Sequence, residues 1–146
     1  MMLSKRTQEH LDKCEPGFRL KIIELLKGCD DVVQKYFPGW SLGISDSQRD
    51  IYEQAGKYSQ GRSWNKDTKK WTVTGSPITW TLTSKHLKTP CEAVDLGLFK
   101  DGAYLCPDPS IPKNAEFWLM IAERAVILGL KPGALWKTPD YPHIEK

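Results

Sequence analysis

Several common signatures are missing from this sequence, and each absence excludes a class of protein. The chain of 146 residues has no apolar run near the length of about 20 residues that a membrane-spanning helix needs. Its first residues lack the apolar middle of a signal peptide. Lysine and arginine form no long block, so the net charge of +3 does not indicate a nucleic-acid-binding protein. We therefore expect neither membrane insertion nor a nucleic-acid partner.

Cysteine spacing excludes two further classes. The chain has four cysteines and no C-x-x-C pair, so it contains neither a zinc ribbon nor a thioredoxin-type motif. In a reducing cytosol such cysteines stay as free thiols, which we expect for Cys14, Cys29, Cys91 and Cys106. Internal repeats and low-complexity linkers are also absent, and the length fits a single domain over residues 1–146 with a sizeable core.

Hydrophobic spacing predicts helices and strands that are segregated along the chain. We expect helices over residues 4–14, 18–27, 30–37, 46–56 and 113–129. Ser45 and Gln48 form a capping box at the start of the fourth helix. Strand patterns cover residues 40–44, 71–75, 78–82, 92–99 and 103–106, with a last strand near the C-terminus, whereas the polar residues 61–70 predict an exposed loop. Because no β–α–β alternation is present, we predict an α+β fold with helices packed on a small antiparallel sheet.

A few histidines and acids are the candidate site residues. His86, Asp95 and His143 are residue types that bind metals, and three such ligands on zinc leave a fourth position for water. An open position of this kind is typical of catalytic zinc, which lowers the pKa of the water and polarises a carbonyl. Asp140, three residues before His143, is then a candidate general base. At this level each residue also has an ordinary interpretation, as a core histidine, a strand-edge acid or a turn-forming aspartate.

The segment that holds Asp140 and His143 raises a geometric question. On a straight strand, positions 140 and 143 would point to opposite faces. Pro139 and Pro142 disfavour a straight strand here, so we expect a bend that aims both side chains at one point. The third histidine, His10, lies in a polar N-terminal helix, where we expect it to be solvated.

Motifs along the chain resemble one protein family. The stretches "SKH" (84–86), "AVDL" (93–96), "GLKPGALW" (129–136) and "DYPHIE" (140–145), in this order, resemble the zinc D,D-peptidases. "IYEQAGKYSQGRS" (51–63) is similar to a helix and following turn of that family, so the resemblance covers essentially the whole chain. The family includes VanY-like D-alanyl-D-alanine carboxypeptidases and the L-alanyl-D-glutamate endopeptidases of bacteriophage endolysins. It implies a hedgehog/D,D-peptidase-like fold and one Zn²⁺ per chain.

The resemblance also implies a role for each site residue. The zinc ligands would be His86, Asp95 and His143. Asp140 resembles the acid that activates the water and later protonates the leaving amine. Ser84 matches a serine that helps to hold substrate. Glu145 resembles an acid that supports the residues around the metal, where it would fix the tautomer of a histidine ligand.

Two features depart from the family pattern. Eight residues separate His86 from Asp95, where the family usually has six. An arginine that many members carry before the glutamine-containing helix is missing from "LGISDSQ" (42–48), and such an arginine suits the binding of a terminal carboxylate. We expect neither Arg49, inside the predicted helix, nor Arg62 to replace it. Cys91 lies in the long spacer, and we expect it not to bind the metal.

Taken with the resemblance, the sequence predicts a zinc peptidase that hydrolyses peptidoglycan stem peptides. The missing signal peptide favours a monomeric phage endolysin, made in the host cytoplasm and released to the cell wall through a separate pore. Its size, and the lack of a separate cell-wall-binding domain, favour L-alanyl-D-glutamate endopeptidase activity. Two alternatives stay open. One is a D-alanyl-D-alanine carboxypeptidase, and the other is a non-catalytic peptidoglycan-binding or virion structural module on the same scaffold.

Overall fold

The computed structural model describes residues 2–49, 59–73 and 85–146. Three helices come first, namely α1 (Lys5–Asp12), α2 (Pro16–Gly28) and α3 (Asp30–Tyr36). Strand β1 (Ser41–Asp46) and the hairpin strands β2 (Arg62–Asn65) and β3 (Lys70–Val73) follow. The rest comprises η1 (Lys85–Leu87), β4 (Ala93–Lys100), β5 (Ala103–Leu105), α5 (Pro112–Ile127), β6 (Lys131–Pro132), η2 (Gly133–Leu135) and β7 (His143–Glu145). In this part of the chain, no helix is both long and apolar enough to cross a membrane.

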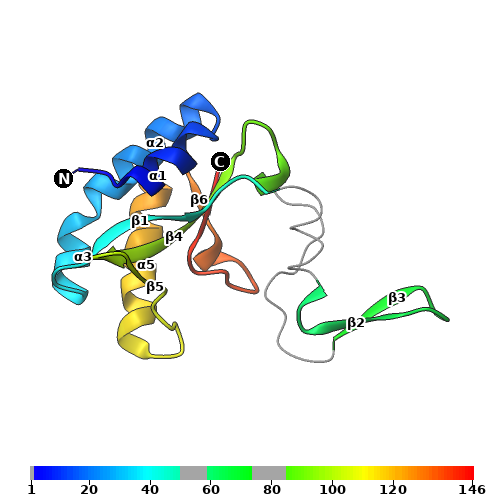
Figure 1. The fold of residues 1–146 in the computed structure, drawn as a ribbon. Coiled ribbons are helices and arrows are strands. Elements are labelled where there is room, and N and C mark those ends of the chain that lie inside the picture. Colours follow the sequence, from blue (N-terminus) through cyan, green and yellow to red (C-terminus); the bar gives the residue numbers. More distant parts are fainter. Residues whose placement is uncertain (1, 50–58, 74–84) are drawn as a thin grey trace.

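An antiparallel sheet with helices packed beside it forms the body of the protein (Figure 1). The sheet order is β1-β4-β7-β6, and β5 pairs with β4 through a tight turn. Along the central strand β4, Val94, Leu96 and Leu98 lie in the core with the apolar faces of α2, α3 and α5. Asp95 lies between them in sequence and projects to the other face, as strand alternation requires. The predicted α+β fold is confirmed.

Local signals explain where the helices begin. The Ser4 side chain caps α1 by accepting a hydrogen bond from the amide of Thr7. Pro16 opens α2, and the Glu15 carboxylate accepts hydrogen bonds from two amides of its first turn. In α5, the Trp118 indole is buried and donates to the Pro107 carbonyl at 2.9 Å. Four of the five predicted helices are present, with bounds within a few residues of the predicted ones.

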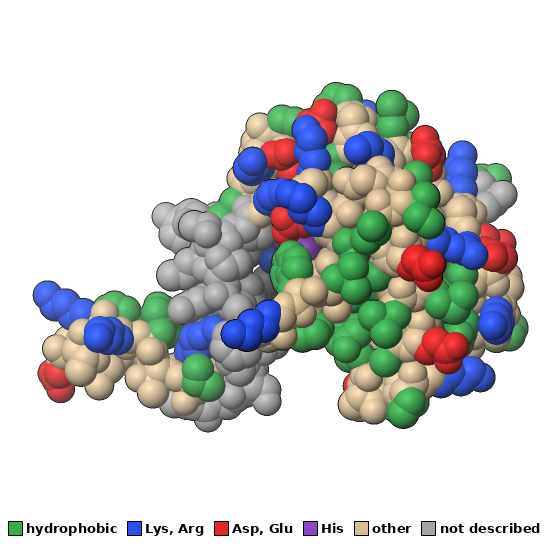
Figure 2. Space-filling view, turned by 180° about the vertical axis from the view of Figure 1, so that it is seen from behind, with side chains coloured by type: hydrophobic (Ala, Val, Ile, Leu, Met, Phe, Trp, Pro, Cys, Tyr) green, Lys and Arg blue, Asp and Glu red, His purple; other side chains and the backbone are tan. Residues whose placement is uncertain are grey.

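The predicted loop over residues 61–70 is wrong, because this segment forms most of a β-hairpin. Trp64 lies opposite Trp71 in the β2–β3 register, with ring centroids 5.5 Å apart. The Asn65 side chain accepts hydrogen bonds from the amides of Asp67 and Thr68 and so closes the turn. The hairpin projects from the body (Figure 1), and basic side chains gather along it (Figure 2). The polar turn residues predict a loop, but the contact between the two aromatic rings stabilises a pair of strands on either side of the turn.

The predicted start of a helix at residue 46 is also wrong. Strand β1 continues to Asp46, and Ser45 donates its hydroxyl to the Asp95 carbonyl at 3.2 Å instead of capping a helix. Gln48 donates its side-chain amide to the Thr89 hydroxyl at 2.9 Å. A bulge after Ile44 keeps the strand paired, so Asp46 lies opposite Asp95. The rest of the predicted helix and the strand pattern at 78–82 lie outside the described residues.

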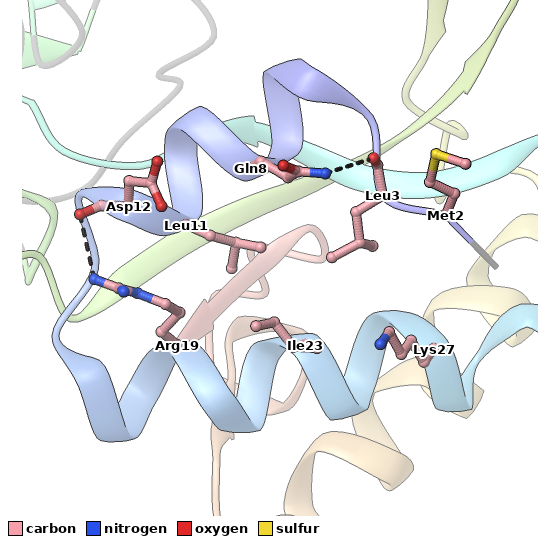
Figure 3. Close-up of a pocket in the computed structure, with 8 residues that line it drawn as sticks. All are labelled: Met2, Leu3, Gln8, Leu11, Asp12, Arg19, Ile23 and Lys27. Carbon is pink, nitrogen blue, oxygen red and sulfur yellow. Dashed lines mark hydrogen bonds between the residues drawn. The ribbon is translucent and has the colours of Figure 1, made fainter.

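A hollow of about 420 Å³ lies between α1 and α2 (Figure 3). The Arg19 guanidinium donates to the Asp12 carbonyl beside it, and Gln8 donates to the Leu3 carbonyl. Figure 3 shows the side chains of Leu11 and Ile23 on facing helices, pointing into the hollow. None of the candidate site residues lines it.

Candidate metal centre

Strand pairing brings the three predicted ligand residues together. In the β4–β7 register, Asp95 lies opposite His143, and η1 supplies His86 from the segment before β4. Nδ1 of His143 lies 3.3 Å from Oδ1 of Asp95, and Nε2 of His86 lies 3.5 Å from the same oxygen. One donor atom from each residue falls within 4.8 Å of the other two. Residues far apart in the sequence thus converge on one point.

The outer nitrogen of each histidine ring is held by a hydrogen bond. Nδ1 of His86 bonds to the Ser47 carbonyl, and Nε2 of His143 bonds to the Glu145 carboxylate at 2.9 Å. In each ring the other nitrogen therefore faces Asp95. A partner of this kind fixes the tautomer and orientation of a metal-binding imidazole.

The inner face of this cluster suits a bound cation. Oδ1 of Asp95 is buried, and two imidazole nitrogens, from His86 and His143, lie within 3.5 Å of it. A buried carboxylate oxygen is stabilised by positive charge, which a bound cation would supply here. Two imidazoles and one carboxylate are ligands that zinc accepts, with a position left open. The residues present therefore fit a zinc ion.

The second oxygen of Asp95 binds the side chain of Arg49. Nη2 of Arg49 lies 2.7 Å from Oδ2 of Asp95, and its Nε lies 2.6 Å from Oδ2 of Asp46. The Arg49 side chain is only 8% exposed, and a buried guanidinium needs such pairing. The prediction that Arg49 lies inside a helix is wrong, because β1 extends to Asp46 and residues 47–49 follow it outside any helix, with the Arg49 amide donating to the His86 carbonyl at 2.9 Å. The spacing of three residues signals the Asp46–Arg49 pair only, whereas Asp95 is 46 residues away in the sequence.

Neighbouring charges and hydrogen bonds shift the pKa values of Asp95 and His143. Burial opposes ionisation of Asp95, but the hydrogen bonds and charges of His143 and His86 hold its pKa well below the usual range. Burial also opposes protonation of His143, yet hydrogen bonds to Asp95 and Glu145 raise its pKa to about 9. Without a metal, His143 therefore carries a proton at neutral pH.

Asp140 lies at the open side of the cluster. Its Oδ2 is 4.0 Å from Nδ1 of His143, and its side chain is 45% exposed. The expected bend is present, because the His143 amide donates to the Asp140 carbonyl at 3.2 Å. Partial burial, and then the charge of Asp95, raise the pKa of Asp140 above its ordinary value. A carboxyl of this kind is suited to exchange a proton with water near the cluster.

Glu145 connects the cluster to a lysine. Its Oε1 contacts His143, and its Oε2 lies 3.0 Å from Nζ of Lys85. Burial opposes its ionisation, but hydrogen bonds from His143 and Lys85 lower the pKa of Glu145 to about 2. The carboxylate thus stays charged and orients the His143 ring.

Three further residues, Trp136, His10 and Cys91, lie near the cluster or the segments that form it, and each makes a defined contact. The Trp136 ring lies 4.8 Å from the His143 ring and is 41% exposed, so it forms a wall beside the cluster. His10 is not simply solvated, because its Nδ1 bonds to the Ser47 hydroxyl at 2.5 Å, next to the carbonyl that holds His86. Cys91 points to Cys14. Ser84 lies outside the described residues.

Comparison with solved structures finds a likeness over almost the whole chain. The protein is similar to the crystal structure of the Serratia marcescens L-Ala D-Glu endopeptidase ChiX, with a TM-score of 0.58 and 20% sequence identity. The match covers 99% of this chain and 89% of that one. The fold is peptidase-like. Neither protein-family models nor curated proteins gave a match. At this level of identity the likeness concerns the fold, and the chemistry must be argued from the site.

Proposed function

We propose that this protein is a zinc metallopeptidase that hydrolyses peptidoglycan stem peptides. One observation carries the proposal: Nε2 of His86, Oδ1 of Asp95 and Nδ1 of His143 converge on one point, with Asp140 at its open side. These three atoms would hold one zinc ion per chain. The peptidase-like fold supports the reading, since a solved neighbour is named an L-Ala D-Glu endopeptidase.

The chain's own groups suit peptide hydrolysis. When bound, zinc supplies Lewis-acid chemistry that polarises a peptide carbonyl and lowers the pKa of water. Asp140 accepts the proton of the attacking water and passes it to the leaving amine, a role that its raised pKa favours. Glu145 and the Ser47 carbonyl keep the two imidazoles oriented. Trp136 lines one wall, against which a substrate can lie.

The position of Arg49 bears on the choice of bond. Two carboxylates, from Asp46 and Asp95, lie within 2.7 Å of its guanidinium and neutralise its charge. We therefore assign Arg49 to the positioning of Asp95 and not to the capture of a terminal carboxylate. This favours an endopeptidase over a carboxypeptidase, and the named neighbour suggests the bond between L-alanine and D-glutamate. We further propose that the protein acts as a monomeric phage endolysin.

Turbidity clearing of outer-membrane-permeabilised Gram-negative cells tests this proposal. We expect the zinc-loaded protein to clear the cells, chelator to stop clearing, and zinc to restore it. Asp140→Asn should slow hydrolysis by about 10²–10⁴-fold while one zinc ion stays bound per chain. Mass spectrometry of the released peptides then identifies the cleaved bond. Zinc-loaded protein that binds sacculi without releasing peptides would contradict the catalytic proposal and favour a peptidoglycan-binding module.

A further inference from the structure

Two buried thiols lie next to each other outside the metal centre. Cys14 follows α1, and Cys91 precedes β4, in the spacer between His86 and Asp95. Their sulfur atoms are 3.4 Å apart, and the two residues are 1% and 0% exposed. The proposed hydrolysis uses neither of them.

The backbone holds the two cysteines in register. They form a parallel β-bridge, in which the Cys91 amide donates to the Lys13 carbonyl and the Glu15 amide donates to the Cys91 carbonyl, both at 2.9 Å. Bridged segments lie about 4.8 Å apart, within the range of roughly 4.4–6.8 Å between Cα atoms that disulfides require. A bond would need the sulfurs to approach from 3.4 Å to about 2.05 Å, which side-chain rotation can supply.

The other two cysteines differ from this pair. Cys29 is buried near Arg124, and Cys106 is exposed at the end of the β5 segment. All four cysteines lie in the described residues and are free thiols in this structure. The geometry therefore singles out one pair among the possible pairings.

We infer that Cys14 and Cys91 form a disulfide site, which closes by thiol–disulfide exchange with a small-molecule disulfide such as oxidised glutathione. The Cys91 thiolate attacks one glutathione sulfur and releases one glutathione thiolate. Cys14 then attacks the Cys91 sulfur of the mixed disulfide and expels the second. The protein loses two electrons and two protons, and glutathione disulfide is reduced to two thiols. The hydrogen bond with Cys14, and then the Ala93 amide, outweigh burial and lower the pKa of Cys91, which suits it to attack first.

The bond would tie the segment between two proposed zinc ligands to the start of α2. Because both sulfurs are buried, exchange takes place through local opening of residues 88–92 or before folding is complete. The biological setting rests on the proposed function: peptidoglycan lies outside the reducing cytosol, so a wall peptidase meets oxidising conditions where it works. Closing a loop of this length restricts the unfolded chain and should raise the melting temperature by about 5–15 °C.

Thiol counting on the full chain tests the inference. After equilibration with oxidised glutathione, we expect maleimide in denaturant to label two thiols instead of four, and peptide mapping to show Cys14 linked to Cys91. Dithiothreitol should restore four labelled thiols and reverse the rise in melting temperature. Cys91→Ala should abolish both effects. Cys29→Ser, a change at another buried cysteine, should keep them, as should Cys106→Ser.

Two outcomes would overturn the inference: four labelled thiols after oxidation, or a bond that maps to Cys29 or Cys106. The thiol count on the unmodified chain decides the matter even where a cysteine variant folds poorly. Neither measurement uses substrate or hydrolysis. A failed disulfide therefore leaves the peptidase proposal standing, and a failed peptidase assay leaves the thiol count unaffected.

Discussion

Replacing Gly133 with alanine should disturb the metal centre without altering any of its side chains. The backbone carbonyl of Gly133 accepts hydrogen bonds from the amides of Asp140 and Trp136, so the chain that carries Asp140 wraps closely round it. A Cβ atom at Gly133 would lie 2.4 Å from the Asp140 carbonyl oxygen and 3.0 Å from Cβ of His143. Both neighbours belong to the proposed site.

The expected magnitude follows from these distances. Ordinary contact begins at 3.4 Å, so the Asp140 carbonyl must retreat by about 1 Å. Metal–ligand distances tolerate errors of only about 0.2 Å, and overpacking of this kind costs about 1–3 kcal/mol. If His143 carries most of that strain, zinc affinity should fall roughly 10- to 100-fold, since each 1.4 kcal/mol is about tenfold. A shift of about 1 Å in Asp140 should also slow hydrolysis about 10²-fold.

A zinc competition titration with a chromophoric chelator, alongside thermal unfolding, measures these effects. Gly28→Ala is the matched control, because a Cβ at this position in α2 meets no atom within 4 Å. The control should bind zinc like the unaltered protein and unfold at the same temperature or slightly higher. If Gly133→Ala also bound zinc and unfolded like the unaltered protein, the close packing described around Gly133 would be refuted.

Three further predictions concern charge and buried hydrogen bonds. Folding raises the pKa of His143 from 6.5 to about 9, so protonated His143 stabilises the fold fully below pH 6.5 and this stabilisation is lost as pH rises through 9. The melting temperature of the metal-free chain should therefore fall between pH 6.5 and 9. Zinc binding near neutral pH should correspondingly release about one proton, measurable by calorimetry in buffers of different ionisation enthalpy; no release would contradict the assignment. Arg49→Gln should cost about 3–5 kcal/mol of unfolding free energy in urea, because it breaks a buried ion pair with Asp95, and a loss below about 1 kcal/mol would refute that pairing. Thr7→Val should cost about 1–3 kcal/mol without changing zinc affinity, since the buried Ile44 amide loses its acceptor.

The convergence of His86, Asp95 and His143 was predictable because motif order and strand alternation agree. The alternation along residues 92–99 predicts that Asp95 projects from the face opposite to the apolar side chains. The predicted last strand near the C-terminus contains His143. What no pattern showed was the register that puts these two residues opposite each other, since register depends on the paired strands and not on either sequence alone.

Arg49 and the β2–β3 hairpin were missed for different reasons. The Ser45–Gln48 pattern is a genuine local helix signal, yet strand pairing with β4 overrides it and uses the Ser45 hydroxyl for another partner. In the hairpin, Trp64 and Trp71 are seven positions apart and are joined only when the chain turns between them. Local propensity describes the turn correctly but cannot show the contact across it.

The place of β7 in the chain gives the centre a built-in order of assembly during synthesis. A nascent chain that ends before residue 143 already holds His86 and Asp95, but lacks the third donor. It also lacks the strand that joins β6 to β4, so the sheet order β1-β4-β7-β6 cannot form. Capture of the proposed zinc ion, and the proposed hydrolysis that depends on it, would therefore wait until translation has passed residue 143 and β7 has docked. A chain terminated before residue 143 would lack the third donor of the proposed site.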